Sequence, residues 1–341
     1  MWVPWTIFLA SASVVVLAGT KLSRYGDQIA KETGLGGLWI GVLLMAAATS
    51  LPEVLTCVSA AFIQAPDMAV GNLLGSSMAN MLVLGIVDLL HRQKSLWRHA
   101  AREHTFSAAL GVSLTGLAAL FILLRIDFVW GSIGIDTVGI SVAYIVGMRL
   151  VYRQERNRLQ KTGSSDDDTI ASPDASPATK LSLRRAGLGF AVGALALLIA
   201  APALASSARD IAQITGIGAT FVGAAFLAIV TSLPELVTAL AAVRLGAFDL
   251  AVGNLFGSNA FNMNILLMTD AAYRPGALLT TVSRTHVVAA LAAILLTNIG
   301  LMGILYRVER RFLHLELDSL LIIIGYGVGL GLIFHLGDSL P

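Results

Sequence analysis

Long apolar segments recur along the whole chain and are separated by short polar stretches. A helix needs about 20 mostly apolar residues to cross the hydrocarbon core of a bilayer, and most of these segments have that length. The pattern therefore predicts ten membrane-spanning helices. Their expected bounds are 3–21, 37–63, 66–91, 104–124, 128–151, 183–208, 217–243, 248–272, 281–306 and 315–337.

Two short motifs occur twice inside these segments. The pentapeptide TSLPE stands at Thr49–Glu53 and at Thr231–Glu235, and it is followed by GNLLGSSMAN from Gly71 and by GNLFGSNAFN from Gly253. The two copies align without a gap when Glu53 is placed on Glu235, and we call this shift along the chain the repeat offset. Of the 32 positions from 49 to 80, 17 are then identical. The chain is therefore interpreted as a duplication of a five-span unit.

An odd number of spans makes consecutive units enter the membrane from opposite sides, so the two units form inverted repeats. The predicted fold is an all-α polytopic membrane protein with ten transmembrane helices in two inverted five-helix repeats. Residues 1–152 form the first repeat and residues 183–341 the second, joined by a flexible linker over 153–182 that is rich in Ser, Asp and Pro. A pseudo-twofold axis in the membrane plane brings Glu53 and Glu235 face to face.

Composition and charge agree with a membrane protein. Of the 341 residues, 56% are hydrophobic and 13% are charged. The Lys and Arg side chains are divided 19 to 4 between the two expected sides, which places the odd-numbered connections in the cytoplasm and both termini outside. We expect a protein integral to the plasma (inner) membrane, with its linker cytoplasmic. Its partners are the lipid bilayer and inorganic cations, with no nucleic acid and no oligomer required.

The TSLPE motif joins two groups that are costly inside a membrane. A carboxylate costs roughly 2.5–3.5 kcal/mol on insertion scales, and Pro52 leaves the Ala48 carbonyl without its helical partner. Thr49 and Ser50 stand four and three residues before Glu53, so their oxygens share one helix face with the carboxylate. Hydroxyls, carbonyls and a carboxylate form an all-oxygen environment that suits hard cations such as Ca²⁺ or Na⁺.

The second copy repeats this chemistry, with its helix also expected to unwind at the proline. It offers Thr231, Ser232, Glu235 and the carbonyls near Ala228 and Val230. The second motif adds two hydroxyl and amide pairs at a spacing of four, Ser76 with Asn80 and Ser258 with Asn262. The alternative is a structural role, in which the hydroxyls bond back to their own helices.

Other polar residues of the spans are expected to be structural. Asn72 and Asn254 either support the site or bind the ion. Asp67 and Asp249 are expected to cap helices, Asp88 and Asp270 to be solvated near span ends, and His286 to be interfacial. No HExxH, GxSxG or paired-Asp motif is present, so the chain offers no expected catalytic centre and no resident cofactor.

At the TSLPE and GNxxGS motifs the chain resembles the sodium/calcium exchangers of the cation/calcium antiporter superfamily, prokaryotic type. The resemblance covers essentially the whole chain. It implies exchange of Na⁺ for Ca²⁺, with central ligands at Glu53 and Glu235. The further ligands that it implies are the side chains of Thr49, Ser50, Ser76, Asn80, Thr231, Ser232, Ser258 and Asn262, and the carbonyls of Ala46 and Ala228.

Departures from the family motif leave alternatives open. Ala48 and Val230 replace the glycine before TSLPE, Ser77 replaces an asparagine, and Asn262 stands where some relatives have Asp. The first alternative is a Ca²⁺/H⁺ antiporter on the same fold, in which protonation of the glutamates replaces Na⁺ binding. A passive cation channel is the remoter one.

Overall fold

The computed structural model describes residues 2–32, 48–90, 96–99, 104–131, 133–162, 183–306, 311–312 and 315–337. The candidate ligand Ala46, residues 37–47 of the expected second span and residues 163–182 of the expected linker lie outside these ranges. The first half contains α1 (Trp2–Glu32), α3 (Leu51–Phe62), α4 (Pro66–Leu90), α5 (Leu96–His99), α6 (His104–Leu124), β1 (Val129–Trp130), β2 (Ile133–Gly134) and α7 (Ile135–Thr162). The second half contains α8 (Leu183–Thr215), α9 (Ala219–Phe221), the π-helix η1 (Val222–Leu227), α10 (Ala228–Arg244), α11 (Phe248–Ala272), α12 (Leu278–Thr281), α13 (Thr285–Tyr306), β3 (Arg311–Phe312), β4 (Leu315–Glu316) and α14 (Leu317–Leu336).

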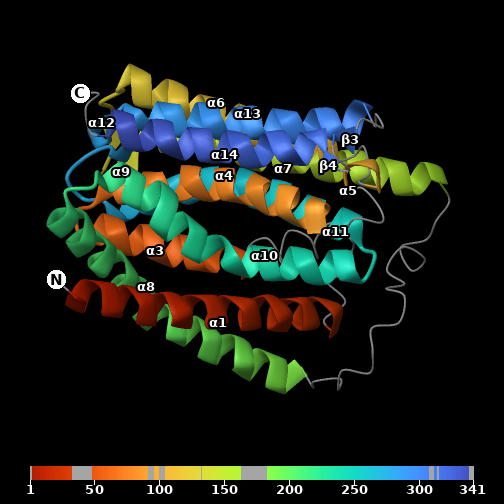
Figure 1. Cartoon of the computed structure of the whole chain (residues 1–341), viewed down its shortest axis with the longest axis horizontal. Coiled ribbons are helices and arrows are strands. Elements are labelled where there is room, and N and C mark those ends of the chain that lie inside the picture. Colours follow the sequence, from red (N-terminus) through yellow and green to blue (C-terminus); the bar gives the residue numbers. More distant parts are fainter. Residues whose placement is uncertain are drawn as a thin grey trace.

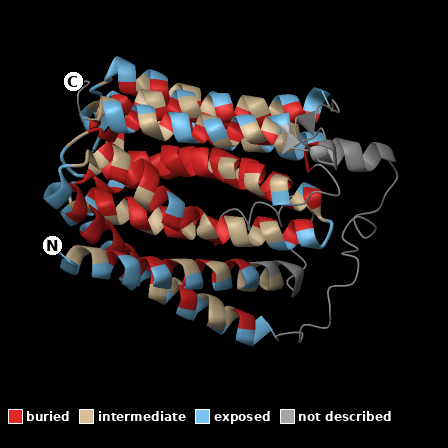
Figure 2. Cartoon of the chain, in the orientation of Figure 1, coloured by how far each residue is buried: buried red, intermediate tan, exposed pale blue. Residues whose placement is uncertain are grey.

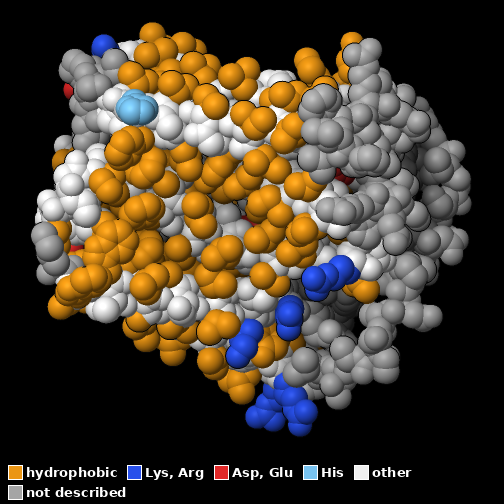
Figure 3. All heavy atoms as spheres, in the orientation of Figure 1, with side chains coloured by type: hydrophobic (Ala, Val, Ile, Leu, Met, Phe, Trp, Pro, Cys, Tyr) orange, Lys and Arg blue, Asp and Glu red, His pale blue; other side chains and the backbone are white. Residues whose placement is uncertain are grey.

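The protein is an all-helical membrane protein, as predicted, apart from two short strand pairs. Within the described residues, eight helical segments are long and apolar enough to cross a bilayer, and α3 is a shorter apolar helix. Figure 3 shows hydrophobic side chains over the middle of one face, with Lys and Arg at its margins. An apolar surface with charge at its margins is what lipid requires.

Some helix bounds differ from those expected. The fifth and tenth spans begin at Ile135 and Leu317, because the residues before them form the antiparallel hairpins β1–β2 and β3–β4. In the first hairpin the turn passes through Gly131 at φ +70°, a conformation that glycine adopts without a steric cost. Helix α7 continues to Thr162, well beyond the expected end of the first repeat at 152.

The helices form layers around one central helix. In Figure 1, α1 and α8 lie along the lower edge, and α6, α13 and α14 lie along the upper edge. Helix α4 runs between them and is buried over most of its length, as Figure 2 shows. It contacts α3, α10, α11, α13 and α14, so side chains on α4 have protein on every side.

The order of elements in the first half is repeated in the second. Helices α4 and α11, the short helices α5 and α12, and the starts of α7 and α14 are all separated by the repeat offset. The two hairpins follow the same offset. The gapless alignment of the sequence is therefore also an alignment of local structure.

Candidate functional site

The two TSLPE motifs and the two motifs that follow them meet inside the bundle. Helix α3 contacts α4, α10 and α11, and α4 contacts α10 and α11. The eleven candidate residues within the described ranges are all buried, each with at most 3% of its surface exposed. They are Thr49, Ser50, Glu53, Ser76, Asn80, Ala228, Thr231, Ser232, Glu235, Ser258 and Asn262.

At the first TSLPE motif the helix is interrupted. Residues 48–49 are helical, Ser50 forms a turn with φ −85° and ψ 6°, and α3 begins at Leu51. Pro52 thus lies in the first turn of α3, where a missing amide proton removes no helical hydrogen bond. The expected break is therefore present in this copy.

At the second TSLPE motif the helix is not interrupted. Helix α10 runs through Pro234, and η1 precedes it in the same continuous helix. The expectation of unwound backbone at this copy is wrong, because one proline removes only the hydrogen bond to the Val230 carbonyl and the next turns stay closed. The Ala228 carbonyl belongs to this closed helix, and the Thr231 hydroxyl lies 3.4 Å from it.

Glu53 lies among hydroxyl groups of the second motif. Ser232 Oγ donates to Glu53 Oε1 at 3.4 Å, and the hydroxyls of Thr231 and Ser76 also lie against this carboxylate. Ser76 and Thr231 are linked to each other by a hydrogen bond of 3.3 Å. A carboxylate from the first half is thus surrounded mainly by groups from the second.

Glu235 has the reciprocal surroundings. The hydroxyls of Thr49 and Ser50 lie beside it, and Glu53 is close enough to interact with it electrostatically. Ser50 Oγ nevertheless forms no hydrogen bond of acceptable geometry with any described residue. Each TSLPE carboxylate therefore faces the hydroxyls of the other copy.

Several oxygen atoms of the candidate residues have no hydrogen-bond partner among the described residues. They are Glu53 Oε2, Glu235 Oε2, Ser50 Oγ, Ser258 Oγ, Asn80 Oδ1 and Asn262 Oδ1. Buried polar atoms without partners are costly unless something else binds them. Oxygen ligands that include two carboxylates suit a hard cation. The described residues contain no group of three or more His, Cys, Asp or Glu side chains of the kind that holds a transition metal.

The asparagine one turn before each serine differs between the halves. Both ends of the Asn72 amide are engaged, because its Nδ2 donates to Cys57 Sγ at 3.2 Å and its Oδ1 accepts from Thr231 at 3.1 Å. The amide of Asn254 is also buried, but neither end finds a partner among the described residues. Asn72 is therefore held by protein groups at both ends, whereas neither end of Asn254 is held by a described residue.

Asp88 and Asp270 are buried, so the expectation that they are solvated is wrong. Asp270 Oδ2 accepts from Gly134 N at 2.7 Å and from Thr137 Oγ1 at 2.6 Å, and its Oδ1 accepts from Leu278 N at 2.8 Å. Asp88, its equivalent at the repeat offset, is held in a similar way. It accepts from Leu96 N and from Ser319 Oγ, both at 2.6 Å.

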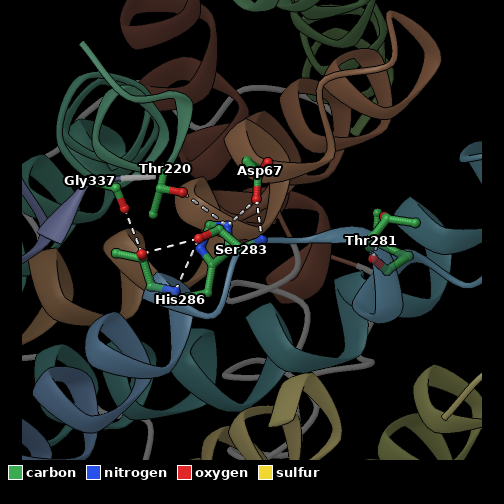
Figure 4. Close-up of polar contacts among 8 residues, drawn as sticks. Asp67, Thr220, Thr281, Ser283, His286 and Gly337 are labelled. Atoms are coloured by element: carbon green, nitrogen blue, oxygen red, sulfur yellow. Dashed lines mark hydrogen bonds and ion pairs between the residues drawn. The ribbon is translucent and has the colours of Figure 1, made fainter. Parts of the chain in front are cut away.

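His286 is also buried inside the protein, at the start of α13. Its Nε2 lies 3.0 Å from Asp67 Oδ1, and because a carboxylate only accepts, the histidine nitrogen is the donor. Figure 4 shows Asp67, Thr220 and Ser283 converging on this histidine, and the Ser283 amide donates to Asp67 at 2.7 Å. The residues at the repeat offset, His104 and Asp249, lie 3.3 Å apart.

Comparisons with known proteins agree with these observations. Residues 3–153 and 186–335 match the profile of the family described as "Sodium/calcium exchanger protein". The chain is 29% identical over 310 residues to the "Putative antiporter CaxA" of Alkalimonas amylolytica, covering 89% of this chain and 92% of that protein. It is 28% identical over 276 residues to the "Inner membrane protein YrbG" of Escherichia coli (strain K12), covering 79% and 80%.

The fold is similar to that of the sodium-calcium exchanger NCX_Mj, solved after soaking with 100 mM Na⁺ and 10 mM Sr²⁺. The TM-score is 0.59 at 22% sequence identity, with 96% of this chain and 97% of the other covered. At this identity the similarity concerns the fold alone.

Proposed function

The chain belongs to the sodium/calcium exchanger protein family, and from this premise we propose that it is a secondary active antiporter that exchanges Na⁺ for Ca²⁺. The ions bind in turn at one site around Glu53 and Glu235 near the membrane midplane. The crossed arrangement carries this proposal, since each glutamate lies against the hydroxyls of the other motif. The family and the fold are those of membrane ion exchangers and not of a class of enzymes.

The proposed architecture has ten spans in two inverted five-helix repeats, over residues 1–152 and 183–341. Both termini are outside, and the linker over 153–182 is cytoplasmic. The common offset of the helices and hairpins supports the duplication. The 19-to-4 division of Lys and Arg supports the orientation.

The ligand set supports competition between Ca²⁺ and Na⁺ for the same oxygens. Ca²⁺ takes six to eight oxygen ligands, and the site offers six that lack a partner among the described residues, besides hydroxyls that can turn toward an ion. The two carboxylates have a formal charge of about −2, which balances one Ca²⁺. Replacing the Ca²⁺ therefore requires other cations at the same glutamates.

Alternating access is expected to come from α1 and α8, which pack against each other at the edge of the bundle. A Cβ at Gly19 of α1 would lie 2.6 Å from Pro234 Cγ and 3.1 Å from Pro52 Cγ. Helix α1 therefore covers both TSLPE motifs. Sliding of α1 and α8 across the other helices would uncover the site first from one side and then from the other.

The test is calcium uptake by purified protein in liposomes loaded with Na⁺, with a pH gradient, or with neither. We expect uptake only into Na⁺-loaded vesicles. Uptake driven by the pH gradient alone would show that the counter-ion is H⁺ and not Na⁺. Uptake without any gradient would reject antiport in favour of a channel.

The site itself is tested by Glu53→Gln and Glu235→Gln. Either change removes one of the two charges that bind the ion, so we expect calcium transport to be lost. Asp127→Asn, which neutralises an exposed carboxylate outside the spans, is the matched control and should transport normally. Normal transport by either glutamine variant would refute the assignment of the glutamates.

A further inference from the structure

Two amide side chains among the candidate ligands have an occupied nitrogen and an oxygen that no described residue binds. Asn80 and Asn262 are each 1% exposed, and the Oδ1 of each lacks a partner among the described residues. Their Nδ2 groups, in contrast, both donate hydrogen bonds across the contact between α4 and α11. The two amides are therefore held by their nitrogen ends.

The residues that accept these bonds are themselves a repeat-related pair. Asn80 Nδ2 donates to Asn259 Oδ1 at 2.9 Å, and Asn262 Nδ2 donates to Ser77 Oγ at 3.4 Å. Ser77 and Asn259 are separated by the repeat offset, like the amides that they hold. Each half thus provides the acceptor for the amide of the other half.

The two acceptors are in turn fixed by backbone groups of α4. Ser77 Oγ donates to Leu73 O at 3.0 Å, which leaves its lone pairs for the Asn262 amide. Asn259 Nδ2 donates to Ser77 O at 3.4 Å, which directs its Oδ1 to the Asn80 amide. Neither acceptor can turn without breaking a second hydrogen bond.

The orientation of the amides matters because their two ends are chemically opposite. The oxygen of an asparagine can bind a cation, whereas its NH₂ group repels one, and a half-turn of the side chain exchanges the two ends. A half-turn of Asn80 would bring its oxygen against Asn259 Oδ1, with no proton between them. The hydrogen bond to Asn259 therefore makes the oxygen-outward orientation the stable one.

We propose that Ser77 and Asn259 are positioning residues for ion binding, which hold Asn80 and Asn262 with their carbonyl oxygens free for the transported cation. The proposal rests on the proposed function, because it assumes that the site around Glu53 and Glu235 binds the ion. In this proposal Ser77 and Asn259 do not bind the ion themselves. The bond to Asn259 is the shorter one, so Asn80 is the more firmly held ligand.

The first measurement is the KM for Ca²⁺ of the Asn259→Ala variant in Na⁺-loaded liposomes. Partners that orient metal ligands are worth 10–100-fold in affinity, so we expect the KM to rise about tenfold or more. Asn259→Ser introduces the residue that the first half has at the equivalent position, Ser77. Its KM should rise less than that of Asn259→Ala. Ser77→Ala should raise the KM less than Asn259→Ala, because it removes the longer bond.

A double-mutant cycle separates orientation from packing. In an Asn80→Asp background the ligand has two equivalent oxygens, so a half-turn changes nothing and the orienting bond is no longer needed. Asn259→Ala should then leave the KM unchanged or lower it relative to that background, because it removes an oxygen that faces the new carboxylate. The same loss in both backgrounds, or an unchanged KM in the original one, would overturn the proposal.

Two further measurements keep the result interpretable. If Asn259→Ala does not fold, the cycle of Ser77→Ala with Asn262→Asp makes the same test. If Glu53→Gln abolishes transport while Asn259→Ala leaves the KM unchanged, only the positioning role fails. If Glu53→Gln transports normally, the proposed site fails, and the positioning role fails with it.

Discussion

The close contact between α4 and η1 allows a sharp test of how packing supports the site. A Cβ added at Gly75 would lie 2.5 Å from Ala224 Cα and 2.7 Å from Ala224 C, both backbone atoms of η1. Carbon atoms pack at about 3.5–4.0 Å, so Gly75→Ala would push the two helices apart by about 1 Å. Backbone atoms cannot rotate away as a side chain can.

The expected cost follows from two opposing terms. Alanine in place of glycine inside a helix gains about 1 kcal/mol from propensity. Overpacking a tight contact typically costs about 1–3 kcal/mol, and a clash with backbone is at the upper end of that range. We therefore expect a net destabilisation of about 1–2 kcal/mol.

The functional effect should exceed the loss of stability. Gly75 adjoins Ser76, whose hydroxyl is 3.3 Å from Thr231 Oγ1. A separation of about 1 Å breaks this hydrogen bond and displaces the hydroxyls around Glu53. Sites tolerate about 0.5 Å of displacement, so we expect at least a tenfold loss of calcium uptake.

The measurements are thermal unfolding in detergent and calcium uptake into Na⁺-loaded liposomes. Gly327→Ala on α14 is the matched control, because a Cβ there meets nothing within 4 Å. It should unfold at the same or a slightly higher temperature and transport normally. Unchanged stability and uptake in Gly75→Ala would refute the idea that the α4–η1 contact sets the distances in the site.

Two further predictions concern buried polar residues outside the site. Asp270→Asn should lower the free energy of unfolding by roughly 1.5–3 kcal/mol, since one acceptor oxygen cannot replace two that accept three bonds. Asp88→Asn should also destabilise the protein, and thermal unfolding of both variants should show a lower unfolding temperature than that of the original protein. His286→Ala should destabilise by about 2–4 kcal/mol through the lost bond to Asp67 and the cavity, whereas His104→Ala, at a half-exposed pair, should cost less than about 1 kcal/mol. Equal unfolding temperatures for the two histidine variants would contradict the assignment of a structural role to His286.

The helical part of the fold could be predicted because lipid permits so few alternatives. Apolar segments of membrane-spanning length must form helices, and the observed bounds of α4 and α11 agree closely with the expected 66–91 and 248–272. The duplication also identified which polar residues correspond between the halves. Glu53 and Glu235 could therefore be identified as equivalent residues from the sequence alone.

The remaining features depend on partners that are distant in the sequence. Asp270 resembles a solvated residue near a span end, but its partners Gly134 and Thr137 belong to the other half of the chain. The duplication carried an unused signal here, because Asp88 and Asp270 are separated by the repeat offset, as are Leu96 and Leu278. The uninterrupted helix at the second TSLPE motif has no such signal, because both copies have the same five residues.

Duplication and burial do not by themselves identify an ion site in this protein. Asp88 and Asp270 are duplicated and buried, like Glu53 and Glu235, yet both oxygens of each aspartate accept protein donors. Each glutamate, in contrast, keeps one oxygen without a partner among the described residues. A carboxylate that protein donors satisfy stabilises the fold, whereas one that they leave incomplete inside a membrane requires a cation or a proton. Among the described residues, incomplete hydrogen bonding, which Asn80 and Asn262 share, is therefore the feature that distinguishes the proposed ion site from the structural anchors.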